Sequence, residues 1–237
     1  MEEAPLHVTL EGTRNTRDLG GWRRADGGRT RAGRLWRSDA FTTATPADLD
    51  ALADAGLRFV VDLRTAAERT QAPGPLVDDA RFEVLPVDLF DGVNRALARG
   101  EVAGDPFDLR TRYLASLTFG RDGYRQAFAA LANALAASPG PVAFHCSAGK
   151  DRTGLVAGLL LRAAGVDDDR ILLDYLLTDE RIEPLRPQLL ADGVALGFPA
   201  DGYARMLQVR EAFLRSVLDA VDDELLAWAA APAAHLG

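Results

Sequence analysis

The segment from Val142 to Gly154 constrains the fold of this 237-residue chain more than any other. It begins with the short run Val-Ala-Phe-His, passes through a glycine-bearing turn, and leads into an apolar stretch that ends near Ala164. Such a pattern is typical of a buried strand that turns directly into a helix, the repeating unit of layered α/β domains. The segment therefore predicts a mainly parallel sheet with helices packed against it.

The rest of the chain repeats this alternation of short strands and helices. Leu57 to Leu63 and Phe82 to Val87 are short, apolar and rich in β-branched residues, as buried strands are. Asp91 to Asp108 has the glycine, aspartate and proline content of a loop. We predict one α/β domain over residues 1–237, with a central, mainly parallel sheet flanked by helices. Helical patterns occur in these segments: Pro46 to Ala55, Gly123 to Ala137, Thr153 to Ala164, Asp167 to Asp179 and Tyr203 to Leu218.

The composition excludes several other classes of protein. Hydrophobic residues make up 48% of the chain and charged residues 26%, as in ordinary globular domains. The only cysteine, Cys146, cannot form an internal disulfide, and the His residues are scattered, so a disulfide scaffold and a cysteine-rich zinc site are excluded. No apolar run could span a membrane, and the N-terminal MEEAPLHVTL lacks the regions of a signal peptide. We expect a cytoplasmic protein without an integral membrane segment, while export without a recognisable signal stays open.

Charge is distributed unevenly along the chain. The net charge of −8 argues against a nucleic acid partner. Residues 14–37 nevertheless hold eight Arg and two Asp, which gives this segment a local charge of +6. Two interpretations stay open for it: a solvated or salt-bridged face, or arginines that attract an anionic substrate. Nothing in the sequence indicates an oligomeric state.

The turn after Val142 carries residues suited to binding and attacking an anion. The loop amides from Ser147, Ala148, Gly149 and Lys150 to Arg152 can point inward and form a cradle, to which the start of the following helix adds its positive dipole end. The planar guanidinium of Arg152 matches two phosphate oxygens. The same electrostatic field stabilises a thiolate at Cys146, which makes it a nucleophile at neutral pH. The turn therefore predicts nucleophilic attack on phosphorus.

The order of residues in this turn resembles a known signature. The pattern His-Cys-x-x-Gly-x-x-Arg-Thr-Gly, typical of the Cys-based protein tyrosine phosphatase superfamily, is matched here by His145, Cys146, Gly149, Arg152, Thr153 and Gly154. With Lys150-Asp151 inside the loop, the chain resembles the atypical bacterial tyrosine/serine phosphatase family more closely. The resemblance extends over roughly residues 12–180, through these segments: Asn15 to Gly21, Arg34 to Ser38, Val61 to Arg64, Arg112 to Leu114 and Asp174 to Leu177.

The resemblance implies a phosphatase with a protein tyrosine phosphatase-like fold and a phosphate-binding loop between a strand and a helix. Its substrates would be phosphotyrosine-type monoesters of proteins, with phosphoserine, phosphothreonine and phosphoinositides as further options. The reaction would pass through a phosphocysteine on Cys146, with Arg152 stabilising the transferred group and no metal or other cofactor. Thr153 can donate its hydroxyl to the sulfur of Cys146. His145 either orders the loop or is an ordinary buried histidine.

Two aspartates are candidates for the general acid that protonates the leaving oxygen. The sequence lacks the Trp-Pro-Asp motif that supplies the acid in many members of the superfamily. Asp151 lies in the loop itself, and the resemblance favours it. Asp88 follows the strand at Phe82 to Val87, where an acid could approach the same site, and an ordinary loop-capping role is its alternative.

Lys150, the only lysine of the chain, has two open interpretations. Its ammonium can bind a second phosphate beside the cradle, or it can form a surface ion pair. Residues 181–205 match the family least and correspond to a stretch where members carry a helical lid. The prolines at 184, 187 and 199 argue against a full two-helix lid here.

Several polar residues near the N-terminus are interpreted as architectural. Asn15, Arg17 and Asp18 are expected to fix the N-terminal segment against the sheet, and Asp62 and Arg64 can pair with them.

Two other functions were weighed against a phosphatase. A rhodanese-like sulfurtransferase also uses one loop cysteine, but it does not explain Arg152 or the direct entry into a helix. A non-catalytic phosphate-binding module needs no nucleophile, which the intact Cys146 and Asp151 disfavour.

Overall fold

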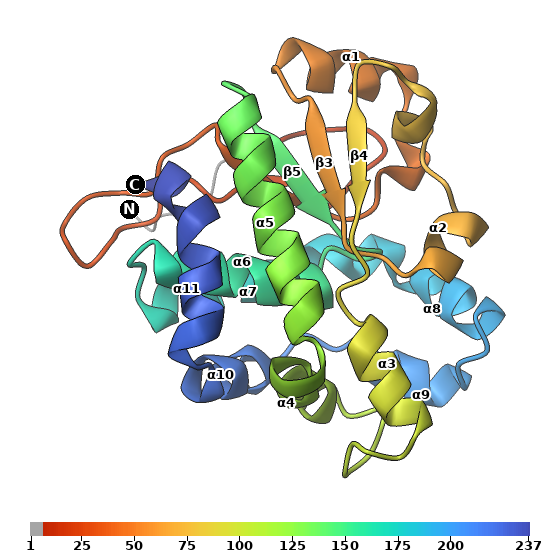
Figure 1. Ribbon diagram of the computed structural model, residues 1–237. Coiled ribbons are helices and arrows are strands. Elements are labelled where there is room, and N and C mark those ends of the chain that lie inside the picture. The colour runs from red at the N-terminus through yellow and green to blue at the C-terminus, as the bar shows by residue number, and fades with distance from the viewer. Residues whose placement is uncertain (1–6) are drawn as a thin grey trace.

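The computed structural model describes residues 7–237 (Figure 1). Residues 1–6, which include much of the segment considered for a signal peptide, lie outside the described residues. The strands are β1 (Arg17–Asp18), β2 (Leu35–Ser38), β3 (Phe59–Asp62), β4 (Glu83–Pro86) and β5 (Val142–His145). The helices are α1 (Pro46–Asp54), α2 (Ala66–Gln71), α3 (Asp91–Ala98), α4 (Leu109–Phe119), α5 (Arg121–Ala137), α6 (Asp151–Ala163), α7 (Asp168–Ile182), α8 (Arg186–Ala195), α9 (Ala200–Met206), α10 (Glu211–Ala220) and α11 (Asp223–Ala233). Short 3₁₀ turns occur at Phe41–Thr43, Pro75–Asp78, Glu183–Leu185 and Ala234–Leu236.

The strands form one sheet in the order β1-β2-β5-β3-β4, in which only β1 and β2 are antiparallel. The register sets Ser38, His145 and Asp62, the last residues of β2, β5 and β3, side by side. The segments that follow these strands therefore leave the sheet at the same edge, where ligand sites of parallel α/β sheets usually lie. The predicted α/β fold with a mainly parallel central sheet is confirmed.

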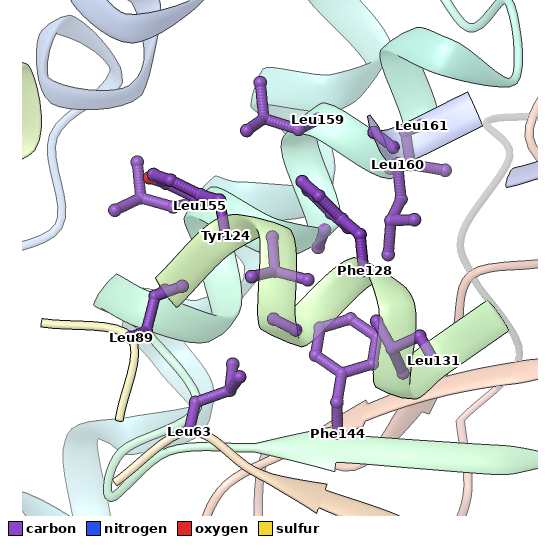
Figure 2. Packing of buried hydrophobic residues seen from close by; sticks show 14 of the residues in the cluster. Leu63, Leu89, Tyr124, Phe128, Leu131, Phe144, Leu155, Leu159, Leu160 and Leu161 are labelled. Atoms are coloured by element: carbon purple, nitrogen blue, oxygen red, sulfur yellow. The ribbon is translucent and has the colours of Figure 1, made fainter. Parts of the chain in front are cut away.

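The two faces of the sheet bury different side chains. Val61, Val142 and Phe144 face a large apolar core shared with helices α5, α6, α10 and α11, part of which Figure 2 shows. Val60 and Ala143, one position along each strand, face a smaller core under α1 and the Phe41–Thr43 turn. This alternation follows from the two-residue period of a strand, and burial on both faces explains why these strands are almost wholly apolar.

Two of the expected segments differ in the structure. The stretch from Asp91 to Asp108 was expected to be a loop, but its first half forms α3, because Val93 and Ala96, three positions apart, are both buried and Val93 packs in the core. The single helix expected from Tyr203 to Leu218 is two helices. The helix is interrupted between Met206, where α9 ends, and Glu211, where α10 begins.

Residues 181–205 contain two helices, α8 and α9, contrary to the expectation drawn from their prolines. Pro187 lies in the first turn of α8, and Pro199 is the residue just before α9. A proline in a first turn leaves no hydrogen bond unmade, because the first amides of a helix have no intrahelical acceptor. The prolines here therefore begin helices rather than interrupt them.

The expected pairing of Asp62 and Arg64 with the N-terminal segment is also wrong. Their side chains pair with each other, with 2.7 Å between Arg64 Nη2 and Asp62 Oδ2. Asp18 instead accepts hydrogen bonds from the amides of Gly20 and Gly33. Among the helices of residues 7–237, none combines the length and the apolar character needed to cross a membrane.

Candidate active site

The loop from Cys146 to Lys150, here called the Cys146 loop, joins β5 to α6 at the edge of the sheet where the parallel strands end. Its carbonyl groups face away from the loop's interior. The Cys146 carbonyl accepts from His145 Nδ1 at 2.9 Å, and the Ser147 carbonyl accepts from the amide of Ala40 at 2.9 Å. Within residues 7–237, the amides from Ser147 to Arg152 have no backbone acceptor. These amides lie beside the N-terminus of α6, in the arrangement that the anion-cradle prediction requires.

Gly149 is required by its position in this loop. Its φ is +64°, in the left-handed region that favours glycine. A Cβ at this position would lie 2.5 Å from the carbonyl oxygen of Ser38 and 2.6 Å from the amide nitrogen of Asp39. The loop therefore packs backbone to backbone against the end of β2, and any side chain at 149 would push it away.

The guanidinium of Arg152 is held by a carboxylate that the sequence analysis did not single out. Nη1 and Nη2 of Arg152 each lie 2.6 Å from an oxygen of Glu68, in a two-pronged ion pair. Glu68 Oε1 also accepts from Ser147 Oγ at 2.6 Å. Burial alone would raise the pKa of Glu68, but the charge and hydrogen bonds of Arg152 outweigh it and hold that pKa well below its usual range. Glu68 therefore stays ionised and fixes Arg152 beside the cradle.

A local signal for Glu68 was present in the sequence. Thr65 and Glu68 form a capping box at the start of α2, in which Thr65 Oγ1 accepts from the amide of Glu68 and Glu68 Oε2 accepts from the amide of Thr65. A Thr followed three residues later by Glu marks a helix start. The pattern locates the helix, but it does not say that the same carboxylate also reaches Arg152.

Lys150 is buried, contrary to both interpretations considered for it. Its Nζ donates to Asp151 Oδ1 at 2.7 Å and to the carbonyls of Met206 and Gln208 at 2.7 and 3.1 Å. These acceptors use the three hydrogens of an ammonium group. In this arrangement the ammonium is not available for a second phosphate, because it fastens the α9–α10 connection to the Cys146 loop.

Asp151 is the first residue of α6 and is partly exposed. Its Oδ1 accepts from Tyr113 Oη at 2.5 Å as well as from Lys150. Burial and the nearby charge of Asp151 raise the pKa of Tyr113 well above its usual range, so the phenol remains a donor. Both contacts go to one oxygen and hold the carboxyl group in a fixed orientation.

Asp88 and Asp151 line one cavity. A cavity of about 420 Å³, here called the α3–α9 hollow, is lined by residues that include Asp88, Asp151, Arg152, Phe90, Arg112 and Tyr203. Asp88 Oδ1 accepts from the amide of Phe90 at 3.2 Å, which is the loop-capping contact considered for it. Burial raises the pKa of Asp88, although the charge of Arg152 opposes the shift. The structure thus brings both candidate acids to one hollow beside Arg152.

His145 and Thr153 complete the set of expected site residues. Burial lowers the pKa of His145, so its ring is neutral at neutral pH, and its Nδ1 hydrogen bond orders the Cys146 loop. Thr153 is buried, and its hydroxyl has no hydrogen-bond partner in the described chain. The expected donation from Thr153 to the Cys146 sulfur is therefore not formed in this structure. An unpartnered buried hydroxyl is an unused donor.

Helices α8 and α9 cover the Cys146 loop. Leu196 and Tyr203 line the α3–α9 hollow, and the same two residues line a smaller cavity of about 120 Å³ on the Ser147 side of Glu68. Cys146 itself is 2% exposed, whereas its neighbour Ser147 lines the smaller cavity and Arg152 lines the α3–α9 hollow.

Comparison with known proteins agrees with this geometry. The model of the tyrosine phosphatase family matches residues 8–227. A protein of Cupriavidus necator with a provisional tyrosine-protein phosphatase name is 36% identical over 94% of this chain and 84% of its own length. A tyrosine-protein phosphatase of Nostoc commune is 38% identical over 59% of this chain and 46% of its own length. The triple specificity protein phosphatase PtpB of Mycobacterium tuberculosis is 34% identical over 67% of this chain and 66% of its own length.

The family match spans nearly all of the described chain, including the Cys146 loop, α2 with Glu68 and the helices that cover them. Thus a buried cysteine that follows a strand, an arginine held by Glu68 at the start of the next helix and a loop of unpaired amides between them occur here in a chain that belongs to the tyrosine phosphatase family.

Proposed function

We propose that this protein hydrolyses phosphotyrosine monoesters of proteins through a phosphocysteine intermediate. The observation that carries the proposal is the loop of inward amides around Cys146, with Arg152 held at its rim by Glu68. The family match and the relatives' names support the same activity. They give no support to a sulfurtransferase or to a non-catalytic phosphate-binding module. A cytoplasmic location stays a prediction from the sequence.

In the proposed first step, the thiolate of Cys146 attacks phosphorus, an S–P bond forms and the ester P–O bond breaks. The leaving oxygen takes the proton of Asp151, and Arg152 with the loop amides stabilises the charge on the transferred group. In the second step a water attacks phosphorus and gives its proton to Asp151. The S–P bond breaks, and phosphate and the free thiolate result.

The roles of the covering helices and of Thr153 belong to the same proposal. Residues 181–205 act as a lid that a peptide-sized substrate must displace, since α8 lines the smaller cavity and Leu196, Phe198 and Tyr203 line the α3–α9 hollow. The unpartnered hydroxyl of Thr153 donates to the sulfur of Cys146 when that sulfur is the leaving group.

Replacing the nucleophile tests the activity itself. Cys146→Ser should lower the hydrolysis of p-nitrophenyl phosphate at least about a thousandfold, because a serine hydroxyl has no comparable anion at neutral pH. Phosphate release from phosphotyrosine peptides, measured in the same assay, should fall equally. A chelator should leave the wild-type rate unchanged, and vanadate should abolish it. Full activity in the variant, or measurable thiocyanate formation from cyanide and thiosulfate without phosphate release, would overturn the proposal.

The general acid is tested with paired variants. Asp151→Asn should slow the hydrolysis of phosphoserine peptides by about a hundredfold or more, and that of an aryl phosphate with a good leaving group far less. Asp88→Asn is the matched variant, because Asp88 lines the same hollow and its pKa is raised, which makes Asp88 the alternative acid. If Asp88→Asn shows the leaving-group dependence and Asp151→Asn does not, the assignment reverses.

Glu68 is proposed as a positioning residue for Arg152. Glu68→Gln keeps the shape but removes the charge, so KM for phosphotyrosine peptides should rise about tenfold with a smaller change in kcat. The lowered pKa of Glu68 means that the ion pair stabilises the fold above the ordinary glutamate pKa of about 4.3 and is lost as pH falls toward the folded value. The difference in Tm between wild type and variant should therefore shrink in acid. An unchanged KM would contradict the role.

Arg112 is proposed to bind a second anionic group of the substrate. This arginine lines the α3–α9 hollow, and its hydrogen bonds go only to neutral groups, Asn94 Oδ1 at 2.9 Å and the Pro106 carbonyl at 3.3 Å. Its Nε is buried and has no partner within residues 7–237. An arginine that lines a cavity and has no carboxylate partner there can bind a second phosphate of the substrate. It therefore favours phosphoinositides or doubly phosphorylated peptides.

Arg112→Gln should therefore lower phosphoinositide hydrolysis about tenfold more than p-nitrophenyl phosphate hydrolysis. Arg110→Gln is the control, since Arg110 is exposed on the same helix α4. Equal loss on both substrates, measured as released phosphate, would remove the second anionic contact from the proposal.

A further inference from the structure

Two arginines and one aspartate form a buried cluster behind the Cys146 loop. Arg17 from β1 and Arg37 from β2 both pair with the carboxylate of Asp174 from α7, and all three side chains are at most 1% exposed. Arg17 Nε lies 2.9 Å from Asp174 Oδ1, and Arg17 Nη2 also donates to Thr178 Oγ1 at 3.1 Å. This Arg17–Arg37–Asp174 cluster has no part in the mechanism described above.

Arg37 of the cluster and Asn15 both donate hydrogen bonds to carbonyl groups of the Cys146 loop. Asn15 Nδ2 donates to the carbonyls of Ala148 and Gly149 at 3.0 and 3.1 Å, and Arg37 Nη2 donates to the Gly149 carbonyl at 2.8 Å. Arg17 Nη1 in turn donates to Asn15 Oδ1. Because a trans peptide holds its C=O and N–H in opposite directions, these contacts turn the amides of Gly149 and Lys150 toward the cradle.

The charge of the cluster does not cancel. Two guanidinium groups share one carboxylate, which leaves a formal charge of +1 in the interior. Burial and the charge of Arg37 lower the pKa of Arg17 to about 10, so Arg17 is still a cation at neutral pH. Arg181, also on α7, adds a further positive charge facing the cluster, and no other carboxylate pairs with Arg17 or Arg37 in the described residues.

Gly154, a residue of the signature in the loop-to-helix turn, allows this approach. A Cβ there would lie 2.9 Å from the ring of Tyr175 and 3.7 Å from Nη2 of Arg37. The cluster therefore packs directly against the first turn of α6, whose N-terminus faces the anion site. A buried positive charge at that distance acts through a poorly screening interior.

We infer that Arg37 and Asn15 are positioning residues for the phosphatase reaction: they turn the loop amides toward the phosphate, and Arg37 also supplies buried positive charge that favours the Cys146 thiolate and the bound anion. The inference rests on the proposed function. A purely architectural role for Arg37 and Asn15 predicts only a loss of stability. The positioning role also predicts weaker anion binding and lower thiol reactivity in variants that are still folded.

The experiment uses the fact that Cys146 is the only thiol in the chain. Alkylation by iodoacetamide at neutral pH reports the thiolate, and protection from alkylation by vanadate reports anion affinity without any need for turnover. Arg37→Met should weaken vanadate protection by about thirtyfold and slow alkylation by about tenfold. Asn15→Leu keeps every charge, so it should weaken vanadate protection by about tenfold and change alkylation less.

Arg34→Met is the matched control. Arg34 is also buried beside β2, and its guanidinium also donates to backbone carbonyls, including those of Leu135 and Gly140, but these lie at the other end of the strand. All variants are measured well below their own melting temperatures. Arg34→Met should lower Tm while leaving vanadate protection and alkylation unchanged.

The outcomes separate this inference from the proposed function. If Arg37→Met and Arg34→Met lose similar stability and neither changes vanadate protection or alkylation, the inference is wrong even though the wild type hydrolyses phosphotyrosine. If wild type protects with vanadate but releases no phosphate, the proposed function fails instead. If Arg37→Met does not fold, Arg37→Lys takes its place. Normal alkylation of Arg37→Lys together with weaker vanadate protection supports the positioning role. Unchanged protection in both Arg37→Lys and Asn15→Leu overturns it.

Discussion

The orientation of the peptide groups in the Cys146 loop is the constraint on which the rest of the site depends. Each carbonyl from Cys146 to Lys150 has a donor outside the cradle, supplied by His145, the Ala40 amide, Asn15, Arg37 and the Gly154 amide. These donors come from β5 and β2, from the segments just before β1 and just after β2, and from α6. The sheet register brings the ends of β2 and β5 together at one edge. An anion cradle made of backbone is therefore a property of the whole sheet edge rather than of the loop alone.

The sequence predicted the backbone of this site well, because local patterns decide it. The alternation of apolar strands with helices gave the α/β layers, and the glycine at 149 and the run from Cys146 to Thr153 gave the loop and its entry into α6. Segments where tertiary contacts outweigh local composition were predicted worst. Asp91 to Ala98 is polar enough for a loop, but two buried side chains make it α3. Pro187 and Pro199 predict an interruption of helices, but they stand in the first turn of α8 and just before α9.

The side-chain partners could not be predicted, because they come from positions far apart in the sequence. Glu68 and Arg152, or Arg37 and Asp174, are joined only by the folding of the sheet. The count of charges along residues 14–37 likewise does not predict which of its arginines are buried. That segment is not one solvated face, since Arg17, Arg34 and Arg37 are buried while Arg14 and Arg31 are exposed. The salt-bridged interpretation holds for Arg17 and Arg37, which both pair with Asp174. A buried arginine and an exposed one look the same in a sequence.

The contacts of Lys150 have a consequence for how the chain tolerates substitution. Two of the three acceptors of its ammonium are main-chain carbonyls, those of Met206 and Gln208, so neither side chain takes part. Residues 206 and 208 can therefore change without loss of this attachment, provided that the backbone keeps its course. Lys150 has no such freedom, because an apolar replacement would leave both carbonyls without this donor and Asp151 with Tyr113 as its remaining side-chain donor. Variation among related chains should accordingly be wide in the α9–α10 connection and narrow at the lysine that holds it.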